Sequence, residues 1–304
     1  MDLFIMDGEN VQLPLWQGSG HACVLDEVSE QIIVLSETEA SISIICNEDK
    51  GDSRKMLMRV IRELAMYHCF QGERLIMHAA ASRSEQGGIM LTGAKNSGKT
   101  SLLLAMLEWD EYSYVTNDRA CVKLQNEVPS IRGIPTIVSV GRVTLTEGSQ
   151  TAGAIAQENA KYLLTNEERR RNQQDPKPEN AKGNYTLSPL QFCTALECKM
   201  AAASPLTRIV VLNNSSAVEA PIFNDLSIDE AAGALFRNSF NSMAVGSETV
   251  FSLVYGMGVK VARDSVHQRC LEFAARMPIM GVTLDSRKLD SICPALLERF
   301  AQSL

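Results

Sequence analysis

The sequence is short of basic charge and of aromatic residues. It holds 29 Lys and Arg against 36 Asp and Glu, a formal net charge of −7, and Phe, Trp and Tyr make up 6% of its 304 residues. It contains no basic run interleaved with aromatic residues, the pattern typical of RNA-binding surfaces. This balance disfavours broad attraction to nucleic acid or to an anionic membrane, so we expect neither as a partner.

Long apolar runs and paired cysteines are also missing. No run reaches the roughly 18 apolar residues of a membrane span. The first residues, MDLFIMDGEN, are acidic where a signal peptide would be basic. None of the eight cysteines forms a C-x-x-C pair or joins a His at metal-ligand spacing, and several, such as Cys46, sit in apolar runs. We therefore expect reduced, buried cysteines and a cytoplasmic protein.

Hydrophobic residues make up 45% of the chain, enough for one large or two modest cores. Within residues 1–50, short apolar stretches separated by Gly, Asn, Asp and Ser predict a small β-rich region: LFIM, ACVL, QIIVLS and SISIIC. Residues 52–69 have the spacing of an amphipathic helix. We expect the remainder, residues 51–304, to form a second domain of α/β class.

The order of elements supports that class. Strands at 74–82 and 87–93 precede a loop and an apolar helix, and further strands follow at 112–115 and 120–124, an arrangement in which phosphate sites form at strand ends. Residues 166–188 lack apolar periodicity and predict a loop or a mobile insertion. Beyond it we expect a strand at 207–213, a helix capped by Ser227 with Glu230, a helical stretch over about 248–276, a strand at 279–285 and a helix from about Lys288.

One motif carries chemistry directly, because Gly93, Gly98, Lys99 and Thr100 satisfy G-x-x-x-x-G-K-[ST]. Glycines let successive backbone amides turn inward, and the helix that follows presents its positive end, which together make an anion cradle. Lys99 can reach the β- and γ-phosphates and the Thr100 hydroxyl can ligate Mg²⁺. The predicted nucleotide-binding residues are Gly93, Ala94, Lys95, Asn96, Ser97, Gly98, Lys99, Thr100 and Ser101.

The glycine loop has other possible interpretations. The stretch could be a tight turn from strand to helix with an incidental lysine, and Lys95 could contact phosphate or be a solvated loop lysine. No N-K-x-D, no D-x-x-G after the loop and no apolar run ending in Asp-Glu at the expected distance is present, which disfavours a small GTPase and a hydrolytic ATPase. The H-R-D and D-F-G elements of the eukaryotic kinase fold are absent too.

Three stretches together, MHAAAS, IMLTGAKNSGKT and VTNDRACV, resemble the nucleotide core of the HPr kinase/phosphorylase superfamily, whose fold is shared with ATP-type phosphoenolpyruvate carboxykinases. In that family a His precedes the loop and an Asp-Asp-Arg element follows it. His78, Asp118 and Arg119 match those positions, and the match covers about residues 74–125. The resemblance implies a P-loop core of this type behind the small N-terminal β-rich region, with ATP and Mg²⁺ as cofactors.

The resemblance also implies roles and shows departures. Asp118 would be the base that accepts a hydroxyl proton and, with Thr100, a Mg²⁺ ligand, while His78 would orient the acid. Asn117 replaces the first Asp of the family element, and Ser130 replaces a Glu that precedes Ile-Arg-Gly. Taken alone, Asp118 could be a cap or turn residue and His78 a structural one. Arg132 could contact phosphate or lie at the surface.

The sequence thus predicts an ATP- and Mg²⁺-dependent kinase that uses Lys99, Asp118 and His78. Its acceptor would be a Ser or Thr hydroxyl of a peptide or protein, such as a ribosomal natural-product precursor of the lasso-peptide type, to which relatives with this core transfer phosphate. Asn117, Arg119 and Arg132 are candidate contacts to phosphate or substrate. The rivals are a small-molecule kinase and a nucleotide-sensing regulatory protein without catalysis, and a homo-oligomer is left open.

A basic run, Arg169, Arg170 and Arg171, lies within the predicted insertion. A solvated run of charge accounts for such a pattern. The alternative is a lid or docking strip that orders over an acidic or phosphorylated substrate.

Overall fold

The structure, a computed structural model, describes residues 4–6, 10–18, 21–26, 31–36, 41–45, 53–72, 74–124, 128–141, 145, 150–161, 184–243 and 263–302. Its largest part is a mixed sheet in the order β10-β9-β6-β7-β13-β15-β14, with β8 beside β6. The strands are β6 (Leu75–Ser84), β7 (Gly87–Thr92), β8 (Ser113–Thr116), β9 (Arg119–Lys123), β10 (Ser130–Gly133), β13 (Ala203–Asn214), β14 (Ile222–Asp225) and β15 (Ile279–Leu284).

Strands β7, β13 and β15 run parallel at the centre of this sheet. Each is apolar along most of its length, as expected for strands covered on both faces. The pairing of Thr92 with Val211 and of Asn214 with Leu284 brings their carboxyl ends to one edge. Strand β6 is antiparallel to β7 and pairs Ala79 with Thr92, so His78 lies at the same edge.

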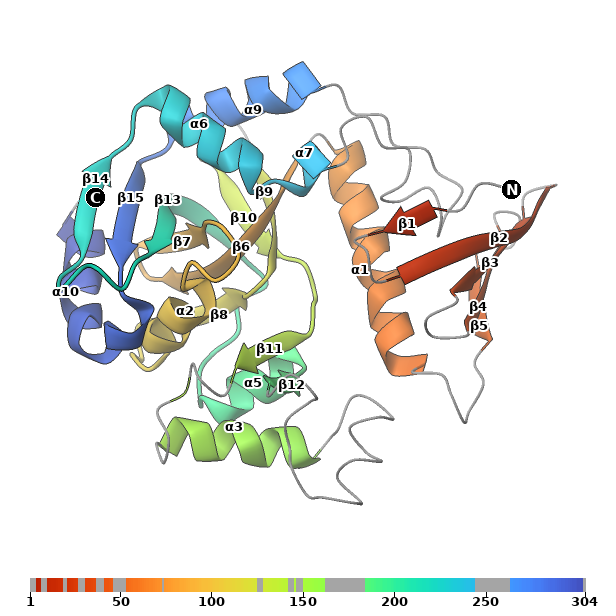
Figure 1. Ribbon diagram of the computed structural model, residues 1–304, viewed down its shortest axis with the longest axis horizontal. Helices are drawn as coiled ribbons and strands as arrows, with labels where there is room; N and C mark the ends of the chain where they lie inside the picture. Colours follow the sequence, from red (N-terminus) through yellow and green to blue (C-terminus); the bar gives the residue numbers. More distant parts are fainter. Residues whose placement is uncertain are drawn as a thin grey trace.

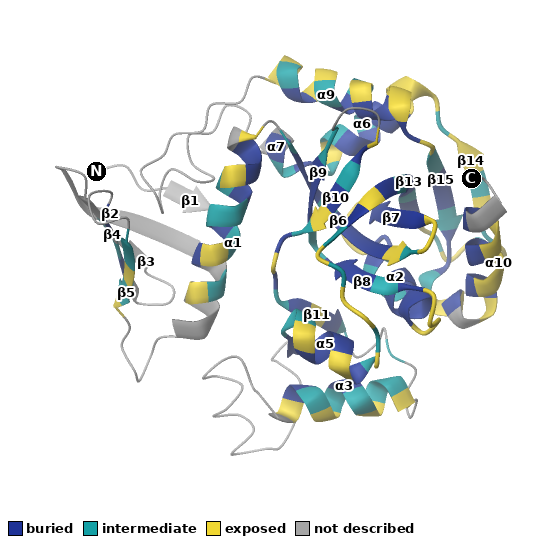
Figure 2. Cartoon of the chain, turned by 180° about the vertical axis from the view of Figure 1, so that it is seen from behind, coloured by how far each residue is buried: buried dark blue, intermediate teal, exposed yellow. Residues whose placement is uncertain are grey.

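Helices cover both faces of the sheet (Figure 1). On one face α2 (Lys99–Leu107) and α10 (Leu289–Gln302) pack against β7 and β13, and on the other face α6 (Ile228–Arg237) and α9 (Arg263–Arg276) do so. Figure 2 shows the central strands and the inward faces of these helices as buried. The mixed α/β class predicted for this region is therefore what the structure shows.

A small lobe projects from the sheet below β8 in Figure 1. It consists of the antiparallel pair β11 (Val138–Gly141) and β12 (Asn184–Leu187) with α3 (Gln150–Lys161) and α5 (Pro189–Ala195). The loop predicted over residues 166–188 is wrong at its end, because Asn184–Leu187 form a strand and Ser188 caps α5. The part that holds the arginine run lies outside the described residues.

The N-terminal part forms a separate antiparallel sheet in the order β1-β2-β3-β4-β5. Its strands are β1 (Phe4–Met6), β2 (Asn10–Gly18), β3 (His21–Asp26), β4 (Gln31–Ser36) and β5 (Ser41–Ile45), and α1 (Ser53–Gln71) follows. Strand β2 was not predicted. Pro14 interrupts its alternation, and the register shifts between Pro14 and Trp16, since proline cannot donate to the ladder. The division into two domains stays a prediction.

The C-terminal half follows the predicted order with two changes. The helical stretch expected from residue 248 lies outside the described residues up to 262, and α9 begins at Arg263. A short turn of 3₁₀-helix, η2 (Ser286–Lys288), precedes α10, and a one-turn helix, α7 (Phe240–Met243), follows α6. In the described part of the chain, no helix combines the length and the apolar character that crossing a bilayer requires.

The predicted cap of α6 is present and offers a test of stability. The Ser227 hydroxyl accepts from the backbone N–H of Glu230, and the Glu230 carboxylate accepts from the backbone N–H of Ser227 at 2.9 Å. We expect Ser227→Ala to lower the free energy of unfolding by about 1 kcal/mol, because an orphan amide of the helix loses its acceptor. Glu230→Gln keeps the reciprocal bond and should cost less. Urea unfolding of both variants measures the difference, and equal losses would contradict the assignment to the cap.

Candidate functional site

The loop between β7 and α2, residues 93–98, has the backbone that the motif requires. Gly93 has φ 147° and Gly98 has φ 91°, conformations that side chains rarely adopt. A Cβ at Gly93 would also overlap the carbonyl oxygen of Leu212, so only glycine fits there. Asn96 takes a left-handed φ of 65°, which asparagine tolerates better than most residues. The loop consequently turns tightly at the start of α2.

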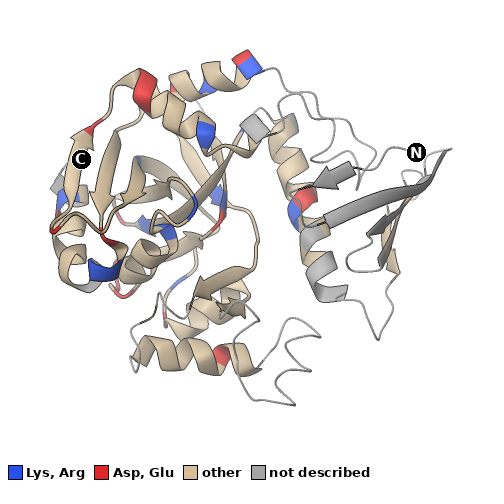
Figure 3. Ribbon diagram, viewed as in Figure 1, with Lys and Arg blue, Asp and Glu red and all other residues tan. Residues whose placement is uncertain are grey.

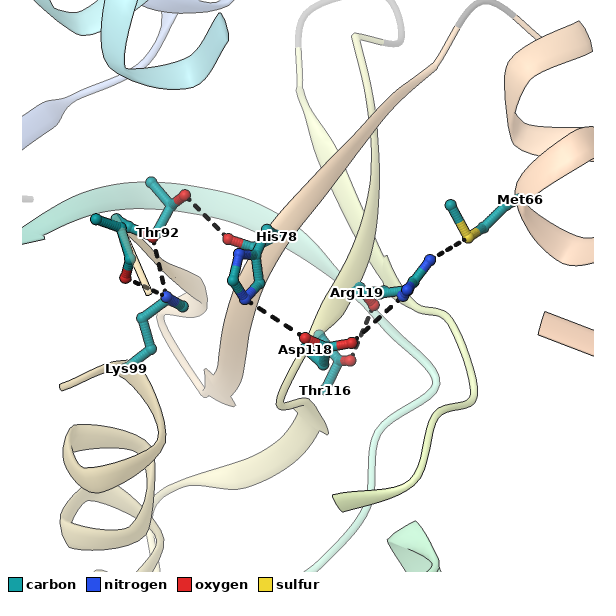
Figure 4. Close-up of polar contacts among 9 residues, drawn as sticks. Met66, His78, Thr92, Lys99, Thr116, Asp118 and Arg119 are labelled. Atoms are coloured by element: carbon teal, nitrogen blue, oxygen red, sulfur yellow. Dashed lines mark hydrogen bonds and ion pairs between the residues drawn. The ribbon is translucent and has the colours of Figure 1, made fainter. Parts of the chain in front are cut away.

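Lys99 is the first residue of α2 and is only 7% exposed. Its Nζ donates to the carbonyl oxygens of Gly93 at 2.9 Å and Ala94 at 2.8 Å, so the ammonium is held over the loop (Figure 4). Burial lowers the pKa of this ammonium, and the nearby charge of Asp118 opposes that effect. The ammonium therefore lies inside the loop, held by two backbone carbonyl oxygens.

Asp118 lies at the turn between β8 and β9, and the sheet order brings it close to the loop. Strand β9 pairs with β6, which pairs with β7, and the backbone N–H of Ala79 donates to the Asp118 carbonyl oxygen at 3.0 Å. Its carboxylate is 3.5 Å from His78 Nε2 and 3.3 Å from Arg119 Nε. The side chain keeps 38% exposure. The carboxylate is thus held from two sides and still open to a ligand (Figure 4).

His78 is fixed mainly through its backbone. Its N–H donates to the carbonyl oxygen of Asn238 at 2.8 Å, and its carbonyl oxygen accepts from the Thr92 hydroxyl at 3.2 Å. Burial, followed by the charge of Lys99, lowers the pKa of the imidazole, while Asp118 raises it. At 3.5 Å its contact with Asp118 is at the outer limit of a hydrogen bond. His78 therefore supports the carboxylate largely as a neutral ring.

Arg119 serves Asp118 rather than the cleft. One guanidinium nitrogen, Nη1, lies 2.9 Å from the sulfur of Met66 on α1, and the guanidinium sits 4.3 Å from the centre of the Phe240 ring. Arg119 is not among the described residues that line the cleft. Packing against α1 and α7 thus fixes the guanidinium, which in turn orients the Asp118 carboxylate.

The two remaining candidates differ in position. Asn117 lines the cleft but is buried, and its Oδ1 accepts a hydrogen bond of 3.1 Å from the Tyr114 hydroxyl. Burial of Tyr114 raises the pKa of that hydroxyl, which stays protonated and able to donate. Arg132 is exposed on β10 and does not appear among the described lining residues. The structure therefore brings Asn117 to the site and leaves Arg132 outside it.

The loop and the Asp118 turn open on one cleft of about 1210 Å³. Most of the predicted site residues line it: His78, Lys95, Asn96, Ser97, Gly98, Lys99, Thr100, Ser101, Asn117 and Asp118. Ser97 is 4% exposed, and its hydroxyl has no hydrogen-bond partner among the described residues. A buried hydroxyl without a partner is costly in an apolar setting and suits a site that receives a polar ligand.

Two walls of the cleft were not predicted. One is the small lobe, which contributes Ser139 and Thr151, with Ile137 directly before it. Thr151 also donates at 3.2 Å to Glu108, the C-cap residue of α2. The other is formed by Asn214, Ser286 and Arg287 at the ends of β13 and β15. The sequence carried a signal for the second wall, since the polar run Asp285–Lys288 directly follows a buried strand.

No group of three or more His, Cys, Asp or Glu that could hold a metal occurs in the described parts of the chain. The two predicted metal ligands, the Thr100 hydroxyl and the Asp118 carboxylate, both line the cleft. Both are oxygen ligands of the kind that Mg²⁺ prefers, and Mg²⁺ commonly takes one or two protein ligands plus phosphate oxygens. The donor set therefore fits Mg²⁺ carried by a nucleotide.

Charged residues of both signs occur along the described helices and strands. Figure 3 shows Lys and Arg interspersed with Asp and Glu on the described helices and strands. Within the cleft, the cations Lys95, Lys99 and Arg287 stand against Asp118 and Glu108. Lys95 and Lys99 thus bring positive charge to the loop side of the cleft, which suits an anionic ligand.

Comparison with known proteins gives little help. No model of a known protein family matches the chain. No curated protein matches it. Among solved structures, it is similar to one described as the Hpr(Ser) kinase/phosphatase from Coxiella burnetii, at 10% sequence identity and a TM-score of 0.31, over 75% of this chain and 94% of that chain. A TM-score this low carries no argument, so the family resemblance of residues 74–125 stays a prediction.

Proposed function

We propose that this protein is an ATP- and Mg²⁺-dependent kinase that transfers the γ-phosphoryl group to a hydroxyl of a peptide or protein. One observation carries the proposal. The buried ammonium of Lys99 and the exposed carboxylate of Asp118 face the same cleft, at the end of a loop whose backbone admits only glycine at Gly93. A phosphate cradle beside a potential base is the combination that phosphoryl transfer to a hydroxyl needs.

Phosphate binding falls to the loop and α2. The first amides of a helix have no acceptor within the helix, and those of α2 follow the glycine turn and face the cleft with the helix dipole behind them. The Ser97 hydroxyl adds a donor that lacks a partner among the described residues. Lys99 exchanges its two carbonyl contacts for the β- and γ-phosphates.

Thr100 and Asp118 would hold Mg²⁺. When bound with the nucleotide, this ion neutralises charge on the phosphates. The side chains of the protein do the rest. Lys99 stabilises charge on the transferred group, and Asp118 accepts the proton of the attacking hydroxyl as the new O–P bond forms and the bond to the β-phosphate oxygen breaks, which releases ADP. His78 and Arg119 keep Asp118 in place for this step.

The size of the cleft supports the proposed acceptor class. A volume of about 1210 Å³ exceeds that of most pockets for small ligands, and it extends from the loop to the small lobe. A peptide segment with a Ser or Thr hydroxyl could lie along the lobe wall and reach Asp118. A small-molecule acceptor would need only the part of the cleft beside Asp118.

The nucleotide-sensing alternative has one observation in its favour. The amide oxygen of Asn117, which replaces the first Asp of the family element, accepts a hydrogen bond from the Tyr114 hydroxyl. Asp118 is then the one carboxylate at these two positions, and a sensor needs no more than nucleotide binding.

The deciding experiment offers the purified protein Mg·ATP and the Ser- or Thr-containing peptides encoded beside its gene, with mass spectrometry of the products. We expect a peptide that gains one phosphoryl group, with equimolar ADP, and no product when EDTA removes the metal. If ADP forms only when a small-molecule acceptor is present, that molecule and not a peptide is the phosphoryl acceptor. Tight nucleotide binding without transfer to any acceptor would overturn the kinase in favour of the sensor.

A further inference from the structure

The turn between β15 and α10 forms one wall of the cleft. Ser286 and Arg287 of this turn line the cleft, together with Asn214 at the end of β13. The sheet order places this wall opposite the acid, because β6 and β9 flank β7 on one side and β13 and β15 on the other. The phosphate loop therefore lies between a wall that carries Asp118 and a wall that carries Arg287.

The turn packs directly on the loop. A Cβ at Gly98 would lie 3.1 Å from the Cβ of Ser286, closer than nearly all real contacts of this kind. The backbone N–H of Ser286 donates to Asn214 Oδ1 at 2.9 Å, which ties the turn to the end of β13. Asn214 itself lines the cleft, and its Nδ2 takes no part in this bond. The position of the turn is thus set by the same loop that begins the site.

Arg287 is oriented by a buried acid. Its Nε and Nη2 donate to the two carboxylate oxygens of Asp285 at 2.9 and 2.8 Å, a bidentate pair. Asp285 is 3% exposed and Arg287 is 70% exposed. This pairing lowers the pKa of Asp285 to about 2, so the carboxylate is ionised at neutral pH. The guanidinium plane is consequently fixed along one edge, while its faces stay open.

The direction of a bound nucleotide follows from Lys99. The motif lysine contacts the β- and γ-phosphates, and Lys99 Nζ is held at the carbonyl oxygens of Gly93 and Ala94. These residues directly follow Thr92, whose hydroxyl donates to the carbonyl oxygen of His78, the neighbour of Asp118. The γ-phosphate must then face Asp118. The α-phosphate and the nucleoside extend the other way along the strand ends, where open α/β sheets bind their ligands. The wall in that direction is the one that carries Arg287.

We propose that Asn214, Ser286 and Arg287 form the nucleoside subsite of this cleft, which takes the base and ribose of a nucleoside triphosphate. The face of the Arg287 guanidinium stacks on the base, and the amide of Asn214 donates to a ribose hydroxyl. This inference rests on the proposed nucleotide-dependent function. It adds residues outside the phosphate motif and outside the region of family resemblance.

The test separates the nucleoside from the phosphates by using two ligands, Mg·ATP and inorganic tripolyphosphate with Mg²⁺, in calorimetric titrations. Arg287→Ala should weaken ATP binding roughly tenfold, the size of a desolvated cation–π contact, and leave tripolyphosphate affinity unchanged. Retained tripolyphosphate binding also shows that the variant is folded. Arg287→Lys keeps the charge but lacks the planar face, so it should lose ATP affinity nearly as Arg287→Ala does.

Lys288→Ala is the matched control. It removes one positive charge from the same turn, and Lys288 is exposed and is not among the described lining residues. We expect wild-type affinity for both ligands. If Lys288→Ala weakens ATP affinity as much as Arg287→Ala does, the effect of Arg287→Ala comes from net charge. That result would overturn the subsite.

The other outcomes are equally decisive. If Arg287→Ala weakens the affinity for ATP and for tripolyphosphate equally, Arg287 is a phosphate ligand. If it changes neither affinity, the nucleoside binds at another wall. Either result overturns the inference. A wild-type protein that binds tripolyphosphate as tightly as ATP has no nucleoside subsite, although the phosphate loop stands. A wild-type protein that binds neither ligand overturns the proposed function itself.

Discussion

Replacing Lys99 with Ala should lower the rate of phosphoryl transfer on the order of 10²–10³-fold, the cost of removing one preorganised donor from a developing negative charge. The Lys99 ammonium is buried at the loop, where water cannot readily take its place. Single-turnover transfer with saturating Mg·ATP measures the loss in the chemical step. An unchanged rate would contradict the role of Lys99.

Lys95→Ala is the control for this experiment. Lys95 belongs to the same loop and lines the same cleft, and Lys95→Ala removes the same charge as Lys99→Ala. The two lysines differ in exposure, because the side chain of Lys95 is exposed. We expect only a small effect, because a solvated lysine is screened from the phosphates. An equal loss in Lys95→Ala would show that the loop acts through its net charge. Urea unfolding checks that loss of the two carbonyl contacts of Lys99 has not unfolded the loop.

Replacing Asp118 with Asn should lower transfer about 10²–10⁴-fold, the usual contribution of a positioned general base. The substitution keeps the size of the side chain and one oxygen for Arg119 or His78, and it removes the group that accepts the proton. Affinity for ATP should change much less than the rate. The rate and the affinity are measured separately, by single-turnover kinetics and by titration.

Asp225→Asn controls for net charge, since Asp225 is exposed on the edge strand β14 and is not among the described lining residues of the cleft. It should transfer phosphate at the wild-type rate. A large loss of Mg²⁺-dependent ATP affinity in Asp118→Asn, with transfer restored at high Mg²⁺, would leave Asp118 the role of metal ligand and remove that of base. A wild-type rate in Asp118→Asn would remove it from both roles.

The local elements were predictable because neighbouring residues determine them. The loop needs glycines at two positions, and the helix that follows begins at Lys99, as the motif indicates. The cap of α6 depends on Ser227 and Glu230, three residues apart, and it is present. In each case the contacts span a few residues, so the chemistry of a short segment is sufficient.

The small lobe could not be predicted in the same way. Its strands β11 and β12 pair residues 138–141 with 184–187, across a long stretch of chain. Strand β11 is only four residues long and has no apolar excess that would mark it in the sequence. Pairing at such separation depends on the packing of α3 and α5 against the two strands, which no local pattern encodes.

The burial of the Arg208 side chain could not be predicted from the sequence either. Arg208 lies within the apolar run TRIVVLN and is 1% exposed, where its Nη1 donates to the carbonyl oxygen of Arg299 at 3.4 Å. Burial lowers the pKa of its guanidinium. A sequence pattern predicts the strand but cannot tell which partner a charged side chain within it will find.

By itself, the sequence determined the α/β class of the main part, the glycine loop with Lys99 at the start of its helix, and the choice of Asp118 as the acid to test. The tertiary structure decided which residues share the cleft. It brought in Asn214, Ser286 and Arg287, assigned Arg119 to support Asp118, and left Arg132 outside. The reason is physical: a phosphate loop is made by consecutive residues, whereas a cleft is made by strand ends that meet only after the sheet has assembled.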